Sequence, residues 1–182
     1  MELYPYFKID GRILSAAERA EERALPRFRG IERTAAWNQQ KMLAAFQKNR
    51  VSESCFAGTT GYGYGDRGRE ALGRVFADAF GAEDALARAD FVSGTHALTV
   101  ALFGVLRPGD TLLSATGEPY DTMRAVIGLS GDGDGSLREF GVRYEQADLA
   151  PDGRPDYEEL ARRIGPGVRM VYIQRSRGYS LR

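Results

Sequence analysis

Three residue types are scarce in this 182-residue sequence. Cys55 is the only cysteine, which excludes an intrachain disulfide and any metal site built from clustered cysteines. His96, the only histidine, lies beside Ser93-Gly94-Thr95, which is interpreted below as a candidate anion-binding loop, so Cys55 lacks a histidine to activate it and we interpret it as structural. Only three of the 25 basic residues are lysines, at Lys8, Lys41 and Lys48. Any chemistry that needs a lysine therefore has few residues to use.

Net charge and long apolar runs are also lacking. The 25 basic residues balance the 25 acidic ones, so no overall field favours nucleic acid or an anionic membrane as a partner. The longest apolar stretch, 97–106, is far shorter than the ~20 residues of a membrane span, and the amino terminus is too polar for a signal peptide. We therefore expect a cytoplasmic protein without a nucleic-acid or membrane partner.

The first part of the chain is predicted to be helical. The sequence from Ser15 to Glu18 has the form of a capping box, which predicts a helix that ends before Pro26. A second amphipathic helix is predicted over 31–47. Asp66 and Gly81 are typical of the start and the end of a third helix.

After residue 88 the pattern changes to alternating strands and helices. Such alternation predicts an α/β fold, with a parallel sheet covered by helices on both faces. Ligands of these sheets bind beyond the carboxyl ends of the strands. The expected strands are 90–92, 111–115, 142–146 and 170–173, and the expected helices are 97–106, 119–129 and 157–164.

The most informative stretch is Ser93-Gly94-Thr95, where an apolar strand is expected to turn into an apolar helix. The first N–H groups of a helix lack intrahelical partners and carry partial positive charge, which suits a phosphate. Ser93 and Thr95 add hydroxyl donors, and Gly94 allows close approach to the backbone. The alternative is an ordinary turn in which Ser93 or Thr95 only caps the helix.

Three further polar clusters are candidates for a site. Tyr62 and Tyr64 alternate with glycine before Arg67, Tyr120 opens the helix expected at 119, and a polar cluster over 174–180 follows the last strand. Their convergence on one edge of a parallel sheet favours a binding site. The alternatives are a glycine-rich linker, an ordinary first turn of a helix and a solvated basic tail.

These motifs together resemble the methionine gamma-lyase-related proteins often labelled aluminium resistance proteins, which are fold-type-I pyridoxal 5′-phosphate (PLP) enzymes. The resemblance runs from about Phe46 to the last residue. It rests on Gly61-Tyr62-Gly63-Tyr64, Ser93-Gly94-Thr95-His96-Ala97, Leu106-Arg107-Pro108-Gly109-Asp110, Pro119-Tyr120-Asp121-Thr122 and Gln174-Arg175-Ser176-Arg177-Gly178-Tyr179-Ser180.

The resemblance implies a fold and a domain organisation. Residues 1–60 would form a helical amino-terminal arm. Residues 61–182 would form the first part of the PLP-binding α/β large domain, with the remaining strands and the small domain absent. The family also implies carbon–sulfur lyase chemistry on a sulfur amino acid, in a homotetramer.

The resemblance also implies roles for particular residues. Ser93, Gly94 and Thr95 would hold the phosphate of PLP, and Tyr120 would stack on its pyridine ring. Tyr62 or Tyr64 would reach the phosphate bound to the neighbouring subunit, with Arg67 as a weaker candidate. His96 receives no firm role. No catalytic residue and no metal ligand is assigned in this chain.

One departure from the family matters for activity. PLP enzymes need a lysine that forms a Schiff base with the cofactor, and none of the three lysines lies in a matching motif. The chain therefore looks like the amino-terminal part of a longer enzyme, and we expect it to be inactive and poorly stable alone. The alternatives are a non-catalytic PLP-fold binding or assembly module and an unrelated nucleotide-binding α/β domain.

Overall fold

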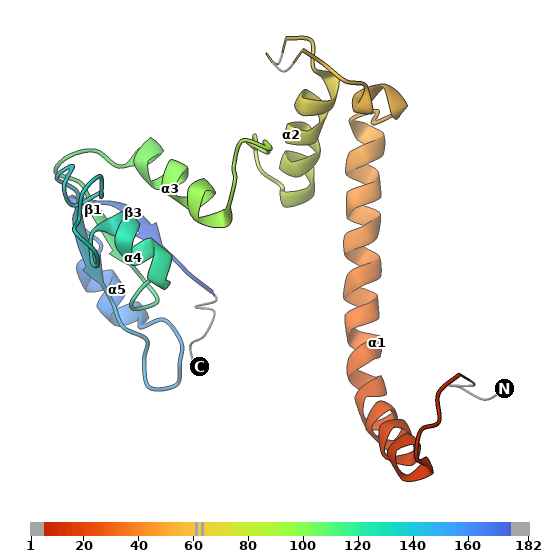
Figure 1. Ribbon diagram of the computed structural model, residues 1–182. Helices are drawn as coiled ribbons and strands as arrows, with labels where there is room; N and C mark the ends of the chain where they lie inside the picture. Colours follow the sequence, from red (N-terminus) through yellow and green to blue (C-terminus); the bar gives the residue numbers. More distant parts are fainter. Residues whose placement is uncertain (1–5, 61, 63, 176–182) are drawn as a thin grey trace. The chain divides into compact units, whose positions relative to one another are not determined.

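A computed structural model describes residues 6–60, 62 and 64–175 of the chain (Figure 1). The contacts between residues divide the protein into two compact units, 1–88 and 89–182. The first unit is helical, and the second is an α/β unit. The helix Arg67–Phe80 belongs by its contacts to the first unit, although the boundary predicted after residue 60 places it with the second.

The first unit begins with one long helix, α1 (Gly11–Lys48), where two helices were predicted. The N-cap is Asp10 rather than Ser15, because the Asp10 carboxylate accepts a hydrogen bond from the Arg12 N–H at 2.8 Å. The helix also continues through Pro26, so the predicted break is wrong. A proline inside a helix removes one hydrogen bond and favours a bend. Figure 1 shows the axis bending in the half that contains Pro26.

Helix α2 (Arg67–Phe80) packs against α1, and its predicted ends are confirmed. The Asp66 carboxylate accepts from the Arg69 N–H at 2.9 Å, and Gly81 adopts the left-handed conformation, with φ of 66°. A short 3₁₀ helix, η1 (Glu53–Phe56), precedes α2 and contacts it.

The second unit contains a parallel sheet, as the sequence predicts, and the described residues form three of its four expected strands. Its strands are β1 (Thr111–Ser114), β2 (Arg143–Gln146) and β3 (Val168–Tyr172), in the order β2-β1-β3. Each outer strand is parallel to β1, and Leu112 is paired with Tyr144 on one side and with Met170 on the other. The carboxyl ends of all three strands therefore lie at one edge.

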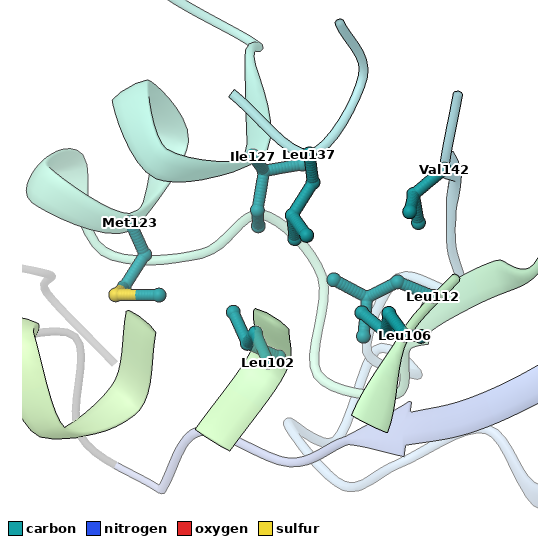
Figure 2. Packing of buried hydrophobic residues seen from close by; sticks show 7 residues of the cluster. All are labelled: Leu102, Leu106, Leu112, Met123, Ile127, Leu137 and Val142. Atoms are coloured by element: carbon teal, nitrogen blue, oxygen red, sulfur yellow. The ribbon is translucent and has the colours of Figure 1, made fainter. Parts of the chain in front are cut away.

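Helices cover both faces of this sheet, which confirms the predicted layering. The helices are α3 (Gly94–Val105), α4 (Asp121–Ile127) and α5 (Tyr157–Arg163). Leu112 and Leu113 are both fully buried, and as neighbours on one strand they face opposite sides. Leu113 packs with Leu160 of α5. Leu112 lies in the larger cluster shown in Figure 2, which comprises Leu102, Leu106, Leu112, Met123, Ile127, Leu137 and Val142.

Two predicted elements of the second unit also differ from the observed ones. Residues 91–92 precede α3 without forming a strand, because none of the described residues pairs with them. Helix α4 begins at Asp121, so Pro119 lies before the helix rather than in its first turn. Tyr120 is consequently the N-cap residue, at the boundary between a loop and a helix.

Candidate functional site

The amino terminus of α3 is built by Ser93, its N-cap. The Ser93 Oγ accepts from the His96 N–H at 3.1 Å, and the Ser93 carbonyl accepts from the Ala97 N–H, also at 3.1 Å. No described residue accepts a hydrogen bond from the N–H of Gly94 or Thr95. Ser93 therefore does cap the helix, and two backbone donors remain beside it for an anion.

Gly94 provides a test of whether this terminus fits a phosphate. A Cβ atom built on Gly94 would have nothing within 4 Å, and the residue does not have a positive φ. Neither packing nor backbone conformation therefore requires glycine here. The missing side chain leaves exposed backbone that a phosphate can approach closely, so the residues present fit the group.

The first turns of α3 and α4 are joined by a pair of hydroxyl groups. The Oγ1 atoms of Thr95 and Thr122 lie 3.0 Å apart, a hydrogen bond in which either can donate. Thr122 was not among the predicted site residues. Its signal in the sequence is its position two residues after Tyr120, in the first turn of the same helix.

Tyr120 is half-buried and is held through its backbone. Its N–H donates to the Oε1 of Gln174, just beyond β3, at 2.8 Å. The Gln174 N–H in turn donates to the Oγ1 of Thr116, which follows β1, at 3.1 Å. The turn after β1, the start of α4 and the end of β3 therefore meet at the carboxyl edge of the sheet, the edge predicted to bind ligands.

His96, which the sequence leaves without a role, supports the loop before α3. Its Nδ1 accepts from the Val92 N–H at 3.4 Å, and its ring lies edge-on to Phe91 with centroids 5.8 Å apart. An Nδ1 that accepts implies that the proton of the neutral ring is on Nε2. His96 thus fixes the approach of the chain to Ser93.

The glycine- and tyrosine-rich segment belongs to the first unit. The side chains of Tyr62 and Tyr64 are 83% and 87% exposed. Their expected role at a neighbouring subunit's phosphate stays a prediction, as does that of Arg67, the first residue of α2. Gly61, Gly63 and residues 176–180 of the other predicted cluster lie outside the described residues.

Packing explains why the residue at position 68, at the end of this segment, is glycine. A Cβ there would lie 2.0 Å from the Cys55 carbonyl oxygen, so only glycine lets α2 approach η1 this closely.

Among the described residues, no group of three or more histidine, cysteine, aspartate or glutamate side chains could hold a metal ion. None of the helices in that part of the chain is both long and apolar enough to cross a membrane.

Comparisons with known proteins identify the family. The family model of methionine gamma-lyase matches residues 13–182. The chain belongs to the methionine gamma-lyase family. An uncharacterised Bacillus subtilis relative, YnbB, is 46% identical over 153 residues, which are 84% of this chain and 36% of YnbB.

Solved structures extend this family membership to the fold. A Clostridium novyi carbon–sulfur lyase involved in aluminium resistance is 47% identical, with a TM-score of 0.88 over 92% of this chain and 41% of its own. A Listeria innocua protein, a candidate cystathionine beta-lyase involved in aluminium resistance, is 44% identical, with a TM-score of 0.89 over 93% of this chain and 42% of its own. The chain thus spans about two-fifths of the length of these two solved proteins.

Proposed function

We propose that this chain forms the phosphate-binding part of the active site of a PLP-dependent carbon–sulfur lyase of fold type I, acting on a sulfur amino acid. The observation that carries the proposal is the start of α3, where the N–H groups of Gly94 and Thr95 have no acceptor among the described residues and nothing fills the space at Gly94. Membership of the methionine gamma-lyase family supports PLP as the anion.

Three groups of residues would hold the cofactor. The backbone and hydroxyl groups of Ser93, Gly94 and Thr95 would bind its phosphate, and Tyr120 would stack on its ring. The Thr95–Thr122 hydrogen bond supports this pairing of roles, because it ties the two helix starts together. Tyr62 or Tyr64 would contribute to the phosphate site of a second subunit, in a homotetramer.

The chemistry would need a lysine from outside these 182 residues. PLP supplies an electron sink when it is bound, and a lysine must anchor it and move protons. Lys8, Lys41 and Lys48 are the only lysines of the sequence, and none of them lies in a motif that matches the family's Schiff-base lysine. We therefore propose that the 182 residues bind the cofactor's phosphate without catalysing the lyase reaction.

The test is a titration of the chain with PLP, followed by the absorbance of the cofactor and by equilibrium dialysis. We expect the chain to bind PLP and inorganic phosphate to displace it. Pyridoxal, which lacks the phosphate, should not bind in the same way. Binding of AMP in preference to PLP would contradict PLP as the anion held at the start of α3. Release of thiol from a sulfur amino acid by the 182 residues alone would contradict the assignment of the lysine to another part of the enzyme.

A further inference from the structure

Gln174 joins three segments of the second unit through one side chain and one backbone group. Its Oε1 accepts from the Tyr120 N–H at 2.8 Å and from the Tyr172 hydroxyl at 3.2 Å. Its own N–H donates to the Thr116 Oγ1 at 3.1 Å. The residue is half-buried at the carboxyl end of β3.

The donors around Gln174 determine which way its amide points. A backbone N–H can only donate, so the atom facing Tyr120 must be the amide oxygen. The Tyr172 phenol is protonated at neutral pH, and burial raises its pKa further above the ordinary value. Both Tyr120 and Tyr172 therefore present hydrogens to the same oxygen.

The start of α4 lacks a side-chain N-cap, so the hydrogen bond from the Tyr120 N–H to Gln174 is important there. Tyr120 is the N-cap residue, and its own side chain makes no capping hydrogen bond. The first N–H groups of a helix need acceptors from elsewhere. Gln174 supplies one for Tyr120 from 54 residues further along the chain. The Tyr120 N–H is thus held by the segment that follows β3.

A second glutamine shows that the arrangement at Gln174 is particular. Gln146 ends β2, is half-buried, and accepts from Tyr144 two residues earlier at 3.0 Å, as Gln174 does from Tyr172. Its Nε2 donates to the Asp148 Oδ1 at 2.9 Å. The side-chain bonds of Gln146 thus go to its own segment, whereas the side chain of Gln174 reaches the start of α4.

We propose that Gln174 is a positioning residue that sets Tyr120 for stacking on the cofactor ring. This inference rests on the proposed function, in which Tyr120 contacts PLP. Gln174 acts through the Tyr120 backbone, so its loss would change the placement of the ring of Tyr120 while leaving the Ser93-Gly94-Thr95 donors intact.

The experiment compares Gln174→Met with Gln146→Met in the PLP-loaded protein. Methionine keeps the size of glutamine and removes the accepting oxygen. The circular dichroism of bound PLP is the main readout, because it reports the asymmetric surroundings of the ring, and PLP affinity is the second. Gln174→Met should alter the dichroic band and weaken binding about fivefold, the effect of one ordinary hydrogen bond. Gln146→Met should change neither.

A third variant, Gln174→Glu, separates positioning from loss of structure. Its carboxylate oxygens still accept from the Tyr120 N–H, so the shape of the dichroic band should return even though the added negative charge weakens phosphate binding. An unchanged band in Gln174→Met, or equal changes in Gln174→Met and Gln146→Met, would overturn the positioning role. Absence of PLP binding by the unsubstituted protein would instead overturn the proposed function itself.

Discussion

Thr95 and Thr122 join two helices through hydroxyl oxygens 3.0 Å apart, so the first turns of α3 and α4 form one hydrogen-bonded unit. Thr122→Val keeps the shape of the side chain and removes this bond. We expect it to weaken PLP binding several-fold, by about 0.5–1.5 kcal/mol, as measured by equilibrium dialysis. Thr99→Val, which removes a hydroxyl bonded to the Thr95 carbonyl within α3, is the control and should bind PLP normally.

Gly94→Val should block the approach of a phosphate to the backbone of α3. We expect at least a tenfold loss of PLP affinity, about 1.4 kcal/mol. The fold should persist, because a Cβ atom at this position would have nothing within 4 Å. Gly104→Val is a matched control in the same helix, since that position is equally open. Equal PLP affinity in the two variants would contradict the assignment of the phosphate to Gly94.

Substitutions at Tyr120 distinguish ring stacking from a role of the hydroxyl. Tyr120→Ala should weaken PLP binding and shift the absorbance of bound PLP, because the aromatic surface is lost. Tyr120→Phe keeps that surface and should change little. Equal damage from both substitutions, in absorbance titrations, would instead assign the function to the phenolic oxygen.

Gly68→Ala should destabilise the helical unit. The added Cβ would lie 2.0 Å from the Cys55 carbonyl oxygen, so η1 and α2 must move apart. Such overpacking lowers the free energy of unfolding by about 1–3 kcal/mol. This decrease can be measured by urea unfolding, with far-ultraviolet circular dichroism as the probe. Gly58→Ala is the control, because its Cβ would have nothing within 4 Å, and a similar loss in both would refute the packing argument.

Acid should weaken the contact between α1 and α2 at Asp78. Hydrogen bonds from Lys48 and Asn49, in that order of effect, lower the pKa of the Asp78 carboxyl from its ordinary value of 3.8. The unfolded chain therefore binds the proton more readily, so this stabilisation is present above about pH 4 and is lost as pH falls through the lower folded pKa.

Asp78→Asn tests this pH dependence. The variant should have a flatter acid limb in thermal unfolding, which can be followed by the fluorescence of Trp37, the only tryptophan. Asp84→Asn is the control, since Asp84 accepts from the adjacent Ala85 N–H. An acid limb for Asp78→Asn as steep as that of the unsubstituted protein would contradict the role of Asp78.

The sequence predicts those features that depend on neighbouring residues. Asp66 and Gly81 mark both ends of α2, because a cap and a left-handed glycine act within one turn. Ser93 marks the start of α3 for the same reason. Strand β1 is recognisable because its residues are apolar or small and all are buried, as in a parallel sheet covered on both faces. The outer strands β2 and β3 alternate between exposed and half-buried residues, and the predicted ranges 142–146 and 170–173 overlap them.

The sequence does not predict features that depend on contacts with residues outside the local segment. Residues 90–92 have the composition of a strand, but a strand requires a paired neighbour, which local composition does not encode. Proline predicts the end of a helix, yet the hydrogen bonds on both sides of Pro26 keep α1 continuous. The contact of Gln174 with Tyr120 spans 54 residues, so it emerges only once the sheet is assembled.

The strand order β2-β1-β3 affects how the protein folds during synthesis. The central strand, β1, leaves the ribosome first, and both of its partners follow it in the chain. Its backbone groups and its two fully buried leucines, Leu112 and Leu113, must therefore wait until Tyr172 has emerged before both edges are paired. Closing such long loops precedes the gain from pairing and slows folding. β1 is consequently the segment that most needs protection from aggregation on the nascent chain.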